Sequence, residues 1–102
     1  MVLMLEQKRD AIADACRRHS VTRMYAFGSV LRDDYRPEES DIDLLVEFDS
    51  LTPFELVDAY FDLLDELREI LGAPVDLVMA DAIKNPYIAA DIEDSKQVLY
   101  AA

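Results

Sequence analysis

Two apolar segments joined through a Gly-Ser pair and an Asp-x-Asp pair constrain the fold of this chain more than any other feature. The first segment, 21–27, ends at the Gly-Ser pair, and the second, 42–48, begins within the Asp-x-Asp pair. Valine, tyrosine and phenylalanine favour extended backbone, so both segments are predicted to be β-strands. The second is too continuously apolar for an exposed edge, which predicts a buried, central strand.

The longest predicted helix has the clearest start and stop signals in the chain. Thr52 can cap the helix, Pro53 suits its first position, and Glu55 completes a Thr-x-x-Glu capping box. Gly72 is a natural C-terminal stop. Apolar residues at steps of three and four predict one buried stripe along this helix, made by Val57, Tyr60, Phe61, Leu64, Leu67 and Leu71.

The order of elements predicts an α/β fold with a small mixed β-sheet covered by helices. A helix is expected over 3–19, with Cys16 as a small core residue, and a third strand over 75–79. A short helix over 87–93 and an extended stretch over 97–100 complete the chain. With 102 residues and no linker or repeat, one domain spanning 1–102 is expected.

Composition restricts the partners and the compartment. The net charge of −12 repels phosphate backbones, so direct nucleic-acid binding is not expected, whereas basic protein surfaces are plausible partners. The single cysteine fits a reducing compartment, and no apolar run approaches the ~20 residues that span a bilayer. A cytoplasmic protein with no membrane association is therefore expected, and a homo-oligomer is allowed.

Three carboxylates could hold divalent metal. Residues i and i+2 of a strand point the same way, so Asp41 and Asp43 can share a metal pair. Asp76, in the expected third strand, could supply another ligand. Two Mg²⁺ ions roughly 3.5–4 Å apart can activate an attacking hydroxyl and hold a triphosphate with its leaving group.

The Gly-Ser pair offers groups that bind phosphate. Gly28 permits a sharp turn and a close approach of backbone to ligand. Backbone amides at the start of a short helix over 29–32, with the hydroxyl of Ser29, would face phosphate oxygens. Arg32 and Arg36 are candidate triphosphate contacts, because guanidinium binds phosphate bidentately. The pattern predicts a site for a nucleoside triphosphate with divalent metal.

Two runs carry a resemblance to a known family: Phe27-Gly28-Ser29 and Ser40-Asp41-Ile42-Asp43-Leu44-Leu45-Val46. They resemble the minimal nucleotidyltransferases, single-domain members of the DNA polymerase β-like superfamily, over essentially the whole chain. The resemblance implies a polymerase β-like fold, Mg²⁺, and ATP or another nucleoside triphosphate as substrate. It makes Gly28 and Ser29 the triphosphate-binding turn, Asp41 and Asp43 the paired metal ligands, and Asp76 the third carboxylate.

Many proteins similar to this one are antitoxins encoded beside a HEPN-domain RNase toxin. The resemblance implies an enzyme that transfers AMP from ATP to a tyrosine hydroxyl of that toxin. Asp41 and Asp43 would hold the metals, Asp76 would help to deprotonate the acceptor, and Arg32 would assist triphosphate binding.

One departure leaves an alternative open. The family usually places ten residues between the serine and the first aspartate, and here 30–40 makes eleven. A loop absorbs one insertion at little cost, so the fold is expected to survive. A non-catalytic antitoxin that neutralises its toxin by binding is the alternative function. Transfer to a small molecule is a weaker one, because no second domain forms an acceptor pocket.

Overall fold

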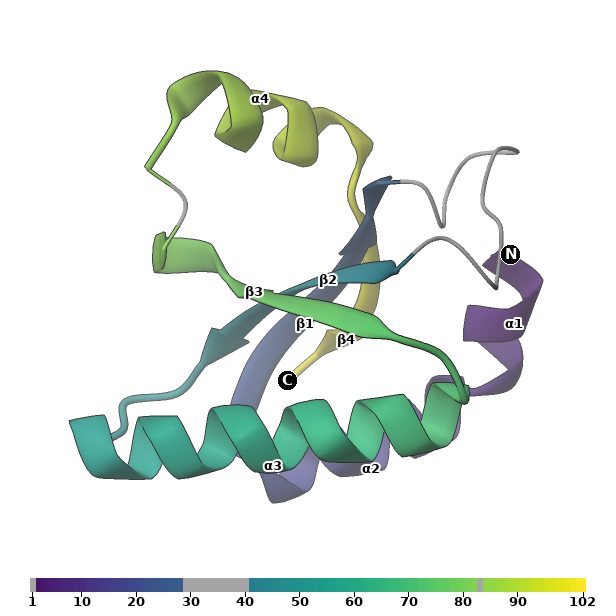
Figure 1. Cartoon of the computed structure of the whole chain (residues 1–102), viewed down its shortest axis with the longest axis vertical. Helices are drawn as coiled ribbons and strands as arrows, with labels where there is room; N and C mark the ends of the chain where they lie inside the picture. The colour runs from purple at the N-terminus through teal and green to yellow at the C-terminus, as the bar shows by residue number, and fades with distance from the viewer. Residues whose placement is uncertain (1, 29–40, 83) are drawn as a thin grey trace.

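The domain is built on one mixed sheet of four strands (Figure 1). The computed structural model describes residues 2–28, 41–82 and 84–102. The strands lie in the order β3-β2-β1-β4, with β2 parallel to β3 and antiparallel to β1, and β1 antiparallel to β4. Their bounds are β1 Val21–Phe27, β2 Ile42–Phe48, β3 Val75–Met79 and β4 Gln97–Ala101. The predicted central position of β2 is confirmed.

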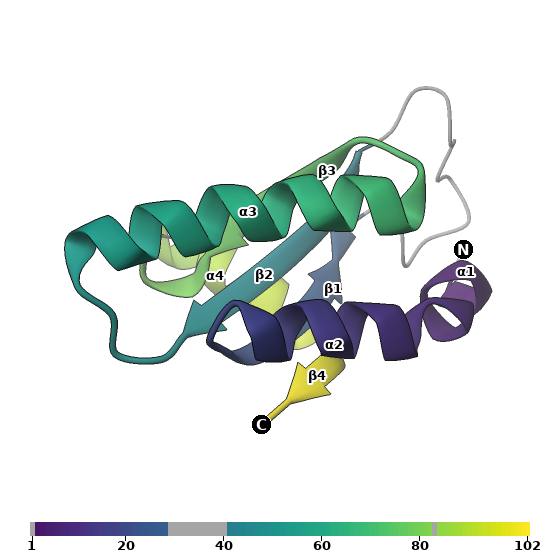
Figure 2. The ribbon, with the colours of Figure 1, turned by 90° about the horizontal axis from the view of Figure 1, so that it is seen from below.

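Helices cover both faces of this sheet. Their bounds are α1 Val2–Gln7, α2 Arg9–Arg18, α3 Pro53–Leu71 and α4 Pro86–Ser95, with a 3₁₀ turn, η2, at Ala80–Ala82. Figure 2 shows α2 and α3 side by side on one face, while α4 lies beyond the other. The predicted α/β class, a small mixed sheet covered by helices, is confirmed. Among the described residues, no helix combines the length and apolar composition needed to span a bilayer.

The predicted strands and the long helix have the bounds that the sequence indicated, but the first helix does not. The single helix expected over 3–19 is wrong, because the chain breaks at Lys8 between α1 and α2. Lys8 makes no capping side-chain hydrogen bond, so no capping residue marks the break. The break accompanies full burial of Leu5 and Ile12 on either side of it.

Two apolar clusters flank the sheet. The larger packs even-numbered residues of β2, such as Leu44 and Val46, against α2 and α3. Cys16 belongs to it, fully buried as predicted, with its Sγ 3.9 Å from the Sδ of Met24. The smaller cluster joins Tyr25, Leu45 and Ile92 beneath α4. The two faces of the sheet therefore differ: one is fully covered, and the other is covered in part.

The capping box predicted for α3 is present. The Thr52 hydroxyl accepts a 3.3 Å hydrogen bond from the backbone N–H of Glu55, and the Glu55 carboxylate accepts one of 3.0 Å from the N–H of Thr52. The hydrogen bond from the backbone N–H of Thr52 lowers the pKa of the Glu55 carboxyl. Gly72 ends the helix in the left-handed region, at φ 61°.

The predicted stripe of α3 is wrong over its first half. Leu64, Leu67 and Leu71 are buried, but Val57 and Phe61 are 54% and 57% exposed. The helix has 19 residues and is roughly 28 Å long, whereas the five residues of β3 span roughly 17 Å. The start of α3 therefore extends beyond the sheet, where less of the domain can cover it.

Candidate active site

The strand register brings two of the predicted carboxylates into one row. Asp43 pairs with Asp76 across the parallel β2 and β3, and Phe27, the last residue of β1, pairs with Asp43 on the other side. Paired residues of neighbouring strands point to the same face of a sheet. Leu44 points into the larger core, so Asp43 and Asp76 lie on the opposite face, the one beneath α4.

Gly28 continues this row at the end of β1. Its φ is +75°, a conformation that L side chains rarely adopt. A Cβ at this position would lie 2.4 Å from Oδ2 of Asp43, which is closer than atoms can approach. Gly28 therefore packs its bare backbone against the carboxylate, and only glycine leaves room for that contact.

The remaining predicted carboxylate, that of Asp41, lies just outside β2. Asp41 precedes β2 by one residue and is exposed, as is Asp76, whereas Asp43 is half-buried. Among the described residues, no three or more His, Cys, Asp or Glu side chains are arranged to hold a metal ion. The backbone thus brings the positions together, but the side chains are not closed around an ion. Ser29, Arg32 and Arg36 lie outside the described residues.

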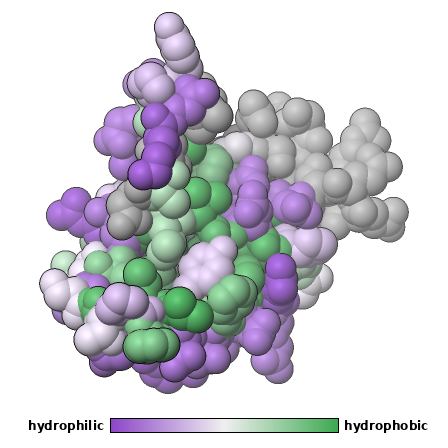
Figure 3. Space-filling model, turned by 60° about the vertical axis from the view of Figure 1, so that its left-hand side comes forward, coloured by the Kyte–Doolittle hydropathy of each residue, from purple (hydrophilic) through white to green (hydrophobic). Residues whose placement is uncertain are grey.

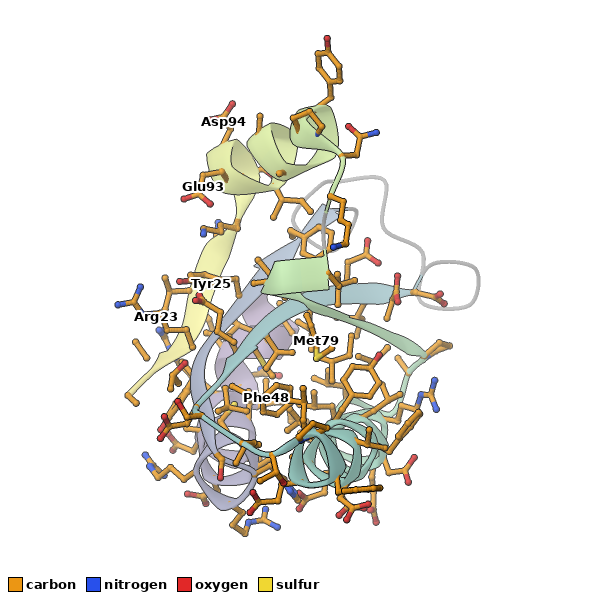
Figure 4. The ribbon with its side chains drawn as sticks, turned by 90° about the vertical axis from the view of Figure 1, so that its left-hand side faces the viewer. Arg23, Tyr25, Phe48, Met79, Glu93 and Asp94 are labelled. Carbon is orange, nitrogen blue, oxygen red and sulfur yellow. The ribbon has the colours of Figure 1, made fainter. Side chains whose placement is uncertain are left out.

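A basic residue that the sequence did not single out lies on the same face. Lys96 Nζ stands 4.1 Å from the centroid of the Tyr25 ring and 2.7 Å from a carboxylate oxygen of Glu93. The hydrogen bond to Glu93 raises the pKa of Lys96, so its positive charge is favoured. Figure 4 shows Tyr25 projecting from β1 and Glu93 from α4. No motif marks Lys96 in the sequence, because its position depends on the pairing of β4 with β1.

A hollow of about 230 Å³ separates this face of the sheet from α4. It is lined by Leu45, Glu47, Ala80, Ala89, Ile92, Glu93 and Lys96. Leu45 follows Asp43 by two residues on the same face, so the hollow adjoins the carboxylate row. The face therefore presents acidic groups at one end and a mixed apolar and charged hollow next to them.

On this face, Gly28 packs against Asp43, and Asp76 lies in register with Asp43 on the next strand. Such an arrangement is suited to group transfer from a nucleotide. The family profile described as "Nucleotidyltransferase domain" matches residues 9–99. The chain belongs to this family of nucleotidyltransferases. The resemblance to minimal nucleotidyltransferases is thereby confirmed, and so is the polymerase β-like fold.

Similar proteins and similar solved structures agree with this assignment. The chain is 47% identical over 77 residues to "Putative protein adenylyltransferase MJ0128" of Methanocaldococcus jannaschii, covering 76% of this chain and 74% of that protein. It is similar to a solved structure described as a "putative minimal nucleotidyltransferase", with 31% identity, a TM-score of 0.76, and coverage of 91% and 90%.

A more distant structure shares the fold alone. It contains a tri-AMPylated Shewanella oneidensis HEPN toxin in complex with an MNT antitoxin. The identity is 21% and the TM-score 0.64, over 96% of this chain and 73% of the other.

Proposed function

We propose that this protein transfers AMP from ATP to a hydroxyl group of a partner protein, most specifically a tyrosine of a HEPN-type toxin, and acts as its antitoxin. Membership of the nucleotidyltransferase family supports the class of reaction. The relative named as a protein adenylyltransferase supports AMP and a protein acceptor. The structure of an AMPylated toxin with its antitoxin supports the kind of partner.

The observation that carries the proposal is the packing of Gly28 against Asp43, in register with Asp76. The close approach holds the backbone of Gly28 beside a carboxylate, so groups that bind phosphate and groups that bind metal would lie next to each other. Gly28 and Ser29 would bind the triphosphate, with Arg32 as an accessory contact. Asp41, Asp43 and Asp76 would be the catalytic carboxylates.

The donor set fits magnesium. Carboxylate oxygens from separate segments, together with phosphate oxygens of the substrate, are the ligands that Mg²⁺ prefers. Asp41, Asp43 and Asp76 would hold it, and when bound it would neutralise charge on the triphosphate and its leaving group. Asp76 is exposed at the edge strand β3, where an acceptor can approach from solvent, and it would accept the proton of the attacking hydroxyl.

The test is incubation of the chain with labelled ATP, Mg²⁺ and the product of the neighbouring gene. Label is expected on the partner, and Asp43→Asn is expected to lower transfer at least ~100-fold, since it removes a carboxylate that would hold the Mg²⁺ needed to neutralise the triphosphate. Asp65→Asn, an exposed change on α3, is the matched control and should leave transfer unchanged. Transfer by Asp43→Asn within ~10-fold of the unaltered chain would contradict the site assignment.

One observation favours a second function, that of an antitoxin which binds its toxin without modifying it. The spacer between Ser29 and Asp41 has eleven residues, one more than the family usually has. The same incubation separates the two functions. A tight complex that carries no label would establish masking by binding, and label on a tyrosine of the partner would establish transfer.

A further inference from the structure

The first half of α3 bears an apolar stripe that the rest of the described domain leaves exposed. Phe54, Val57 and Phe61 are 87%, 54% and 57% exposed, and steps of three and four residues place them on one side of the helix. Single apolar residues at a surface need no explanation, but a contiguous row of large ones marks an interaction surface. The row points to a partner that covers it.

Two hollows beside this stripe join into one groove. One, of about 360 Å³, lies at the end of β2, and the other, of about 210 Å³, lies along α3; both are lined by Leu56 and Met79. The larger also has Phe48 and Leu51 in its wall. Figure 3 shows hydrophobic side chains gathered around a hollow on this face, with hydrophilic residues at its border, and Figure 4 shows Phe48 and Met79 between the sheet and α3.

The charges around the groove are acidic. The end beside β2 is lined by Glu47 and Asp49, and the exposed side of α3 near the stripe carries Asp58 and Asp62. Within the described part of the chain, neither hollow has a lysine or arginine in its wall. The surface is therefore apolar at one end and along its floor, with negative charge at the other end and along its margin.

We propose that this groove docks a basic amphipathic segment of the partner protein. Large apolar side chains of that segment occupy the end formed by Val57 and Phe61, and a lysine or arginine lies against Glu47 and Asp49. A groove of this kind accepts the apolar face of a helix by shape and its cationic residues by charge. The inference rests on the proposed function in so far as the segment belongs to the protein that receives AMP.

The position of the groove suits such a partner. Met79 ends β3, whereas Asp76 lies three residues earlier, roughly 10 Å away along the strand. A segment held in the groove thus leaves the carboxylate face open for an acceptor side chain of the same partner. A second copy of this chain suits the groove poorly, because two acidic margins, each on a chain of net charge −12, would face one another.

The probe is a fluorescent helical peptide of leucine and lysine with one apolar and one basic face, titrated with the full chain at about 0.15 M salt. It is expected to bind at least ten times more tightly than two controls. One control has glutamate in place of lysine, and the other has the same composition with its apolar face scrambled. Equal binding of the glutamate or the scrambled peptide would overturn the proposal.

Variants of the chain locate the binding. Phe54→Ser and Phe61→Ser, at positions that are 87% and 57% exposed, are each expected to weaken peptide binding at least tenfold. Val98→Ser, at an apolar position on β4 that is 50% exposed, is the control and should bind as the unaltered chain does. Circular dichroism melting checks that each variant is folded.

Two results would overturn the proposal. One is unchanged peptide binding by folded Phe61→Ser, since attraction would then be general to an acidic surface. The other is a dimer in sedimentation velocity that Phe61→Ser dissociates, since a second copy would then occupy the groove. The titration contains neither ATP nor Mg²⁺, so it is independent of AMP transfer. Loss of transfer in Asp43→Asn would not affect the peptide result, and loss of peptide binding would not affect the transfer result.

Discussion

Gly28 gives the sharpest prediction for a single residue. Gly28→Ala introduces a Cβ 2.4 Å from Oδ2 of Asp43 and places alanine at φ +75°. We expect the free energy of unfolding to fall by about 1–3 kcal/mol, from backbone strain and the forced shift of the carboxylate. AMP transfer should fall with it, because Asp43 moves. Urea unfolding and the labelled-ATP assay measure the two effects.

Gly72→Ala is the matched control for that change. Gly72 has a similar φ of +61°, but a Cβ there would meet nothing within 4 Å. It should cost about 1 kcal/mol of stability, from strain alone, and leave transfer intact. Equal transfer by the Gly28→Ala and Gly72→Ala variants would show that the contact with Asp43 has no role in the reaction.

The buried thiol of Cys16 gives a pH dependence. Desolvation by burial raises its pKa from 9.0 to about 12, partly opposed by the charge of Arg17. Above about pH 9 the unfolded chain loses this proton while the folded chain keeps it, so stability falls as pH rises toward 12. Between about pH 8 and pH 10, the unaltered chain should lose about 1 kcal/mol more than Cys16→Ala does. Urea unfolding at the two pH values measures the difference, and equal losses would contradict it.

At the scale of single residues, the sequence indicates candidate residues for the site but not how they are arranged in space. Gly28, Asp43 and Asp76 were singled out from their types and their places relative to apolar runs. That Asp43 and Asp76 share a row depends on the register between β2 and β3, which pairs residues 33 positions apart in the sequence (76 − 43 = 33). Local patterns carry no information on that register, and none on Lys96, which the pairing of β4 brings over Tyr25.

Among the elements, α3 depends on its first turn. Thr52→Ala removes the hydroxyl that accepts a hydrogen bond from the backbone N–H of Glu55. The second hydrogen bond of the box, from the Thr52 N–H to the Glu55 carboxylate, then loses its fixed geometry. The expected loss is about 1 kcal/mol in the free energy of unfolding, measured in urea. Ser50→Ala, an exposed change outside the box, is the control and should alter stability by less than about 0.5 kcal/mol. A Thr52→Ala variant as stable as the Ser50→Ala variant would contradict the role of the box.

Local chemistry explains why the elements were predicted so unevenly. Thr52, Pro53 and Gly72 act within one turn of the ends of α3, so the sequence alone indicated its bounds. Lys8 breaks the first helix with no capping hydrogen bond, so the sequence carries no local signal of that break. The exposure of Phe61 has the same origin: its periodicity is that of a core face, but the sheet does not reach it.

The whole molecule is governed by its charge as well as by its two apolar clusters. Acidic residues outnumber basic ones by 22 to 10 on a domain with a radius of gyration of 13.0 Å. A few pairs are attractive, as where Glu66 of α3 meets both Arg18 and His19. The larger number of unmatched carboxylates repel one another, and that repulsion opposes the compact state.

Salt should therefore stabilise this protein. At about 0.01 M salt the screening length is roughly 30 Å, comparable to the longest extent of the domain, 38 Å, so most charges repel one another; at about 0.15 M it is roughly 8 Å. A gain of about 1 kcal/mol between these conditions corresponds to a rise in Tm of roughly 4–8 °C for a domain of this size. Thermal melting followed by circular dichroism measures it.

The variant that isolates the cause neutralises three exposed carboxylates at steps of four and three along α3, by Asp58→Asn, Asp62→Asn and Asp65→Asn. Its net charge is −12 + 3 = −9. It should melt higher than the unaltered chain at low salt and gain less from added salt, because fewer like charges remain to be screened. A Tm that falls as salt is added would mean that attractive pairs such as Glu66 with Arg18 dominate the balance instead, since screening weakens those pairs as well.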